Sequence, residues 1–254
     1  RELVTVAFRN GDGLSTETRE FWTSPLGPVV HRGGGKIYVL KAGADGEHRA
    51  GEQFLRMMRA TSLDEWKDAM RMRARVTSNF TYADADGNIL YVWNGVVPSL
   101  PHPSGGDTAA IPARSTADVW TRLVPWDSLP QLLNPRGGYV RNENDAPYHT
   151  NMRQILDRAR FPQNFPEPAL RLRSQLSLEL IDNDRKYTLE DIVKLKNSYR
   201  MLLADRVKPD LLAAVRASSP DAATTAAAEM LAAWDNTASH EARGAVLFEI
   251  WWQR

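Results

Sequence analysis

The chain has 254 residues, of which 43% are hydrophobic and 25% are charged, with 32 Lys and Arg against 31 Asp and Glu. This composition is typical of a globular protein, and the length suits one large domain or two small ones. A net charge of +1 excludes strong electrostatic attraction to nucleic acid or to an acidic membrane surface. The absence of cysteine excludes disulfides, cysteine-ligated metals and thiol catalysis. No apolar run is long enough to span a bilayer.

The first hundred residues have the pattern of short strands with two helices inserted among them. Apolar and β-branched runs predict strands at residues 3–8, 16–22, 25–30 and 36–40, separated by turns rich in Asn and Gly. The second helix has a clear start, because Ser62 and Glu65 have the spacing of a capping box. Trp66, Ala69 and Met70 recur at helical spacing and are expected to form its buried face.

After this helix the hydrophobic period changes from helical spacing to two. Residues 76–82 and 89–93 are predicted to be strands of a hairpin, because the turn residues at positions 84–88 separate them. Residues 98–135 are rich in Pro, Gly and Ser, and a loop of this length usually lines a site or wraps a surface. From residue 151 onward helical patterns dominate. Thr188 and Asp191 cap one helix, two more are predicted at 205–215 and 222–234, and 245–252 could be a helix or a strand.

These patterns predict an α+β fold in three parts. Residues 1–98 form a β-rich part with capped helices and a hairpin, residues 99–150 form a long Pro/Gly loop region that borders the site, and residues 151–254 form a helical segment. We expect a mostly antiparallel sheet with helices on one side, and we expect the helical segment to pack against that sheet as a layer.

Several motifs that would indicate other functions do not fit their context. The run Gly33–Lys36 lacks the Ser or Thr and the helix that complete a phosphate-binding loop, so a hairpin turn is the better interpretation. The arginines at positions 56, 59, 71, 73 and 75 have the pattern of a solvated helix face rather than of a nucleic-acid site. The five histidines have no metal-ligand spacing, and Asp84, Asp86 and Asn88 lack the glutamate that closes a calcium loop. Nothing fixes the separation of Glu2, Glu17 and Glu20, so they do not indicate a glycosidase pair.

Four blocks resemble the penicillin acylase family in sequence, order and spacing. They are the strand at 26–30 (LGPVV, similar to "HGPV"), the helix at 62–69 (similar to "-EW--A"), the hairpin at 78–91 and the loop at 134–147. The loop reads NPRGGYVRNENDAP and is similar to the family pattern "NP-GGyv-N-NdaP". This loop looks closest to the branch that holds acyl-homoserine-lactone, cephalosporin and lipopeptide acylases. The resemblance covers roughly residues 20–150.

The resemblance implies an N-terminal-nucleophile hydrolase, with its mostly antiparallel sheet. In this family a freed Ser at the start of the β chain attacks an amide carbonyl, and its own α-amino group is the general base. Backbone N–H groups and one Asn side chain hold the oxyanion. By resemblance, Asn79 is expected to be that Asn, whereas Asn142 and Asn144 are expected to shape the loop beside the site. No cofactor or metal is assigned, since the calcium ligands of family members cannot be mapped onto this chain.

The departures from the family pattern predict an incomplete enzyme. Residue 1 is Arg, so we expect an internal fragment of a β subunit that is inactive alone. Its partners would be the α chain and the N-terminal part of the β chain from the same precursor, together with a small N-acyl substrate of the β-lactam, acyl-homoserine lactone or lipopeptide type. Residues 97–101 lack the Arg with which some members bind polar substrate groups. By resemblance the parent protein is expected to be periplasmic or secreted. The alternative is a non-catalytic module that binds a ligand or partner on an acylase-derived scaffold.

Overall fold

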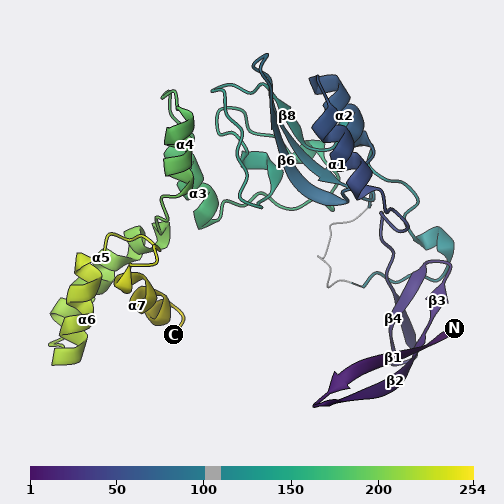
Figure 1. Ribbon diagram of the computed structural model, residues 1–254, viewed down its shortest axis with the longest axis horizontal. Helices are drawn as coiled ribbons and strands as arrows, with labels where there is room; N and C mark the ends of the chain where they lie inside the picture. Colours follow the sequence, from purple (N-terminus) through teal and green to yellow (C-terminus); the bar gives the residue numbers. More distant parts are fainter. Residues whose placement is uncertain (101–109) are drawn as a thin grey trace.

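The computed structural model describes residues 1–100 and 110–254, so residues 101–109 of the predicted long loop lie outside the described part. Figure 1 shows an open, elongated arrangement with a sheet and two helices in the middle and a group of helices at one end. The described strands form three separate antiparallel sheets rather than one, with the orders β1-β2, β3-β4-β5 and β6-β7-β8. No helix in this described part is both long enough and apolar enough to cross a membrane.

The first two sheets are hairpins built from the predicted strands. β1 (Glu2–Asn10) pairs along its whole length with β2 (Gly13–Phe21), and both faces of this two-stranded ribbon are exposed to solvent. β3 (Thr23–Ser24), β4 (Gly27–Gly33) and β5 (Lys36–Val39) form the second sheet. Gly34 and Gly35 form the turn between β4 and β5, and both have positive φ, as a two-residue hairpin turn requires. The hairpin interpretation of Gly33–Lys36 is therefore confirmed.

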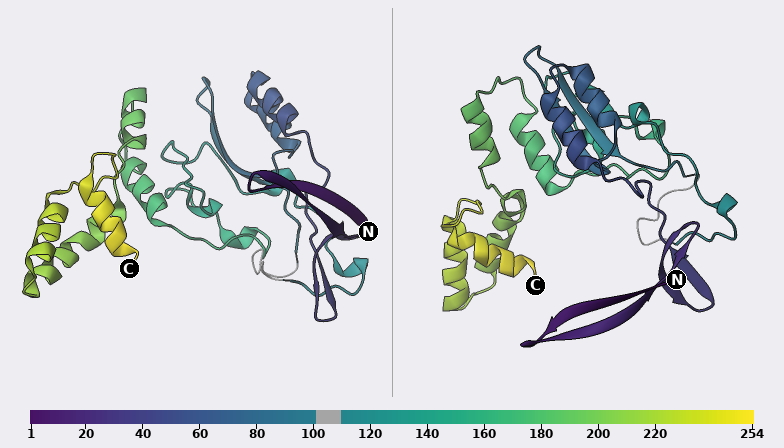
Figure 2. Two further views of the ribbon diagram at one scale, coloured as in Figure 1. Left: turned by 60° about the horizontal axis from the view of Figure 1, so that its bottom comes forward. Right: turned by 45° about the vertical axis from the view of Figure 1, so that its right-hand side comes forward.

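The central core lies between two helices and the third sheet. α1 (Ala50–Arg59) and α2 (Leu63–Arg71) pack beside β6 (Thr77–Ala83) and β7 (Ile89–Gly95), and the short strand β8 (Gln131–Leu133) pairs with β7. Figure 2 shows the two helices on one face of this sheet, as predicted. The buried residues that meet here come from α2, β7 and the loops that follow: Trp66, Met70, Leu90, Val92, Val124, Trp126, Leu129 and Phe165.

The N-terminus of α2 differs in one detail from the predicted capping box. Ser62 Oγ accepts a hydrogen bond from the backbone N–H of Glu65, as predicted. The Glu65 carboxylate, however, accepts from the backbone N–H and the hydroxyl of Thr61 (2.7 and 2.9 Å) rather than from the backbone of Ser62. The hydroxyl of Thr61 offers a second donor, so the carboxylate reaches one residue further back. At α4 (Leu189–Lys196), Thr188 and Asp191 form the complete capping box.

The back of the chain is helical, but it does not form the expected layer on the sheet. α3 (Leu172–Ile181) and α4 are followed by α5 (Leu202–Ala217), α6 (Ala222–Ala233) and α7 (Arg243–Trp252). The last three helices enclose a core of their own, formed by Ala204, Leu231, Trp234 and Phe248, and they lie to one side of the central sheet (Figures 1 and 2). The expectation of a helical layer against the sheet is therefore wrong, because these helices bury their apolar faces against one another.

Candidate functional site

The β6–β7 hairpin holds Asn79 in a fixed position. Asn79 lies opposite Trp93 in the antiparallel register, and its Oδ1 accepts a 2.6 Å hydrogen bond from the hydroxyl of Tyr91. Tyr91 is completely buried, and burial raises the pKa of its phenol, so the hydroxyl keeps its proton. Because the amide oxygen is occupied, the Asn79 NH2 is turned the other way. Within the described residues this NH2 has no hydrogen-bond acceptor.

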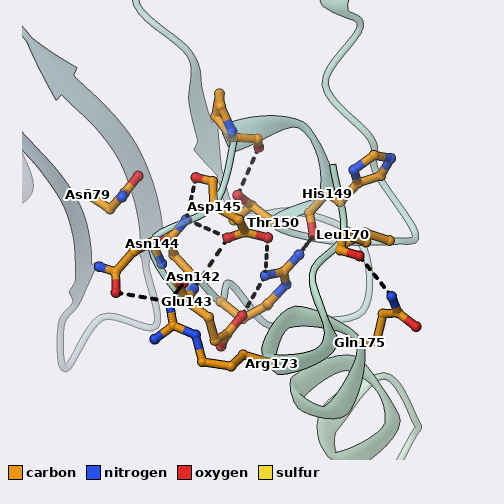
Figure 3. Close-up of polar contacts among 12 residues, drawn as sticks. Asn79, Asn142, Glu143, Asn144, Asp145, His149, Thr150, Leu170, Arg173 and Gln175 are labelled. Atoms are coloured by element: carbon orange, nitrogen blue, oxygen red, sulfur yellow. Dashed lines mark hydrogen bonds and ion pairs between the residues drawn. The ribbon is translucent and has the colours of Figure 1, made fainter. Parts of the chain in front are cut away.

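A buried ion pair stiffens the loop that follows β8. Arg141 and Asp145 are 2.8 Å apart, with side chains only 3% and 2% exposed. Arg141 also contacts Glu143 at 2.5 Å and donates to the backbone oxygen of His149 at 2.7 Å. Burial alone would raise the pKa of the Asp145 carboxyl, but hydrogen bonding to Arg141 and its charge outweigh burial and hold that pKa below its usual range. The Asp145 carboxylate is therefore ionised at neutral pH. Figure 3 shows these contacts.

Asn142 connects the ion pair to the hairpin. Its NH2 donates to Asp145 Oδ1 at 3.0 Å and approaches the Tyr91 hydroxyl at 3.5 Å, while its Oδ1 accepts from the backbone N–H of Asn144 at 2.8 Å. The Asp145 carboxylate can only accept, so it fixes the orientation of the Asn142 amide. The Asn142 NH2 is a donor toward the Tyr91 oxygen, so the Tyr91 hydroxyl donates its own proton to Asn79 Oδ1. Both hydrogens of the Asn142 NH2 are thus directed to contacts within the described residues.

Asn144 is held by its backbone, and its side chain is exposed. Its φ of +61° is a left-handed conformation that is uncommon for a residue other than glycine. Arg173, from α3, donates to the backbone oxygen of Glu143 at 2.6 Å and to Asn144 Oδ1 at 3.5 Å (Figure 3). The Asn144 NH2 has no acceptor within the described residues. Asn144 therefore has the same arrangement as Asn79, with a held oxygen and a free donor.

Asn79 and Asn144 both line one cavity of about 260 Å³. Its lining includes residues from the hairpin, from the loop and from the segment before α3: Asn79, Trp93, Asn144, Asp145, Ala146, Pro166, Glu167, Ala169 and Arg171. The fold thus brings together Asn79 and Asn144, which are 65 positions apart in the sequence. The sequence did not indicate Arg171 or Arg173, because neither lies in a motif. A second cavity, of about 310 Å³, lies between the 43–47 loop and Arg73 and contains no predicted site residue.

The turn at 84–88 has a structural explanation. Asp84 Oδ1 accepts from the backbone N–H of Asn88 at 2.8 Å, and Asp84 Oδ2 accepts from the Asn88 side chain and the Tyr82 hydroxyl, both at 2.9 Å. These hydrogen bonds lower the pKa of the Asp84 carboxyl. They close the hairpin turn, so Asp84 is part of the scaffold that presents Asn79.

The penicillin amidase family matches the chain over residues 1–254. This chain belongs to the penicillin amidase family. It is 30% identical over 147 residues to penicillin G acylase from Escherichia coli, an alignment that covers 56% of this chain and 16% of that protein. Its fold is similar to that of a thermostable penicillin G acylase from Alcaligenes faecalis in an orthorhombic form, with a TM-score of 0.62 at 22% identity.

The predicted membership of the acylase family and the α+β fold are therefore confirmed. The structural similarity covers 98% of this chain but 45% of the solved acylase chain. The chain thus spans less than half of the length of these relatives. The three-part division of the chain, the roles of Asn79, Asn142 and Asn144, and the branch within the family stay predictions.

Proposed function

We propose that this chain supplies the oxyanion-stabilising part of an enzyme that hydrolyses the amide bond of a small N-acyl substrate. The observation that carries the proposal is the cavity lined by both Asn79 and Asn144, whose NH2 groups have no hydrogen-bond acceptor among the residues that the structure describes. Donors that are oriented before the reaction stabilise a tetrahedral oxyanion most effectively, because no reorganisation is needed as charge develops. Family membership supports the same chemistry.

The two amides differ in how well they could reach a substrate. Asn79 is the donor implied by resemblance, and its half-buried side chain lies at the hairpin wall of the cavity. Asn144 is exposed, and its strained backbone is kept in place by Asn142 and Arg173. Such strain is often retained at functional sites. We therefore include Asn144 as a second candidate donor, beyond its expected role in shaping the loop.

The experiment is a comparison of side-chain truncations in the acylase that contains this chain. Asn79→Ala is expected to lower kcat about 100-fold or more with little change in KM, since the contact is made mainly in the transition state. Asn144→Ala is expected to have an effect of the same kind. Asn183→Ala is a matched control, because Asn183 lies beyond α3 and bonds only to its neighbours. If neither cavity variant lowers kcat more than Asn183→Ala does, the cavity is not the oxyanion site.

The nucleophile and its base are proposed to come from the remainder of the same precursor. The chain exposes 17,261 Å² of surface, whereas a compact monomer of 28.5 kDa exposes about 11,300 Å². The excess includes the apolar side of the β1–β2 ribbon, with Val6, Phe8 and Phe21, and the outer face of α7, with Val246 and Ile250. Surfaces of this kind are normally covered by a partner.

A test of this assembly is static light scattering on the chain alone and after co-expression with the remainder of its precursor. The chain alone is expected to dimerise or aggregate, whereas co-expression should give a single soluble complex. A monodisperse monomer of the isolated chain would instead favour the alternative of a self-contained binding module. The parent enzyme is further proposed to act in the periplasm or outside the cell, which fractionation of the producing cells would test.

A further inference from the structure

Three charged side chains line the cavity that contains Asn79 and Asn144, and two of them are already neutralised. Asp145 forms the buried ion pair with Arg141. Glu167 contacts Arg158 at 3.1 Å. The third, Arg171, is exposed, and within the described residues its guanidinium forms no ion pair and no hydrogen bond. The cavity therefore presents one uncompensated positive charge next to two neutral amide donors.

Several arginines near the cavity are engaged by the scaffold, whereas Arg171, like Arg136 and Arg160 outside the cavity lining, has no side-chain contact within the described residues. Arg141, Arg153, Arg158 and Arg173 each bind a carboxylate or a loop backbone oxygen, so their charges serve the scaffold. Arg171 makes no such contact although it lies two residues from Arg173. Its backbone oxygen accepts a hydrogen bond from the N–H of Gln175 in the first turn of α3. This hydrogen bond holds the Arg171 backbone at the N-terminus of the helix, and the Arg171 guanidinium has no partner within the described residues.

We propose that Arg171 is a specificity-determining residue that binds a carboxylate group of the substrate. The inference rests on the proposed amidase function, and it adds that the substrate carries a negatively charged carboxylate. Arginine binds a carboxylate through paired N–H donors, and such charge-assisted hydrogen bonds are stronger than neutral ones. A volume of about 260 Å³ holds a part of a substrate rather than a whole drug-sized molecule. Trp93, Pro166 and Ala169 provide an apolar wall for the group that bears the carboxylate.

The carboxylate could belong to the acyl part or to the amine part of the substrate, and matched anilides distinguish the two. The two anilides of the first pair differ only in a carboxylate at the end of the acyl chain. The two anilides of the second pair differ only in a carboxylate on the aniline ring. In Arg171→Gln, kcat/KM for the relevant charged substrate is expected to fall about 10- to 100-fold, mainly through KM. Its neutral counterpart should be unchanged, and Arg171→Lys should lose less.

Arg160→Gln is the matched control, because Arg160 is also exposed and lies outside the cavity lining. It removes the same charge from the protein and should leave the ratio of charged to neutral substrate unchanged. Equal loss in Arg160→Gln and Arg171→Gln would overturn the proposal, since a general electrostatic field would then explain the preference. An unchanged ratio in Arg171→Gln for both pairs would overturn it as well.

A binding measurement separates this proposal from the proposed function. Isothermal titration of the acylase with benzoate, at low ionic strength, is compared with benzamide as the neutral analogue of the same shape. Benzoate is expected to bind with an affinity that falls at least tenfold in Arg171→Gln, and benzamide to be insensitive to the substitution. If no anilide is hydrolysed but benzoate binding still depends on Arg171, the amidase proposal fails and the carboxylate site stands. If benzoate binding does not depend on Arg171, the carboxylate site fails.

Discussion

The buried pair of Arg141 and Asp145 should be the most sensitive point of the site loop, and its two halves should differ. Removing one partner of a buried ion pair costs about 3 to 5 kcal/mol, because the other charge remains buried without compensation. After Asp145→Ala, Arg141 still contacts Glu143 and the backbone oxygen of His149. We therefore expect the lower figure, about 3 kcal/mol.

Arg141→Ala should cost more, because the Asp145 carboxylate then has no cation. It retains hydrogen bonds from Asn142 at 3.0 Å and from the backbone of Glu143 at 3.3 Å. The expected loss in the free energy of unfolding is about 5 kcal/mol. Urea unfolding of the acylase that contains this chain, followed by tryptophan fluorescence, measures both losses. Arg160→Ala, at an exposed position, should change the stability by less than about 0.5 kcal/mol.

The pH dependence of the free energy of unfolding tests the same ion pair independently. In the wild type the pKa of Asp145 is lower when folded than when unfolded, so its contribution to stability is present above the unfolded pKa, about 3.9. That contribution is lost as the pH falls through the folded pKa. In Arg141→Ala, burial should raise the Asp145 pKa, so stability should fall as pH rises. The difference between the two proteins should be large at pH 7 and shrink below about pH 4. A small difference at pH 7, or one that does not depend on pH, would refute this reasoning.

Three further predictions concern single residues. Gly27→Ala should destabilise the β3–β5 sheet strongly, because the φ of Gly27 is +128° and a Cβ would lie 2.1 Å from the backbone oxygen of Leu40. Gly34→Ala has open space around the added Cβ and should lower the free energy of unfolding by about 1 kcal/mol. Thermal melts of the two variants check this ordering, and an equal shift would contradict it. Ser62→Ala should lower the free energy of unfolding by about 1 kcal/mol through loss of the α2 cap, which urea titration measures. Asn142→Ala should lower the melting temperature and change both kcat and KM, unlike Asn79→Ala; a pure loss of kcat without destabilisation would contradict its structural role.

Local sequence patterns were sufficient for most of the secondary structure. The period of two and the turn residues at 84–88 predicted the β6–β7 hairpin. They did not reveal that β7 is buried on both faces, with Leu90 and Val92 on one side and Tyr91 on the other. The ambiguous segment 245–252 is a helix. Gly244 packs directly against Trp234, where any Cβ would lie 2.4 Å from the Trp234 Cβ. No periodicity in the segment itself reveals that contact, which depends on a residue ten positions away.

The arrangement of these elements, and half of the candidate site, could not be read from the sequence. α5, α6 and α7 were expected to cover the sheet, but Trp234 and Phe248 pack 5.5 Å apart, ring centre to ring centre, and give the helices a core of their own. Family resemblance indicated Asn79, Asn142 and Asn144 as separate positions. It did not indicate that the first and the last share a cavity, or that Arg171 lies beside them, since these contacts join segments that are distant in the chain.

The hydrogen bonds around the cavity form a directional series that begins at a charge. The Asp145 carboxylate can only accept, so it orients the NH2 of Asn142, and Asn142 leaves the Tyr91 proton to bond Asn79. Each member has one orientation that satisfies its neighbours, so the Asn79 amide is oriented without any contact from a ligand. On the other side, Arg173 connects α3 to the same loop. The helical part therefore belongs to the site through Arg173 and through Arg171 in the cavity lining, although its core is separate from that of the sheet.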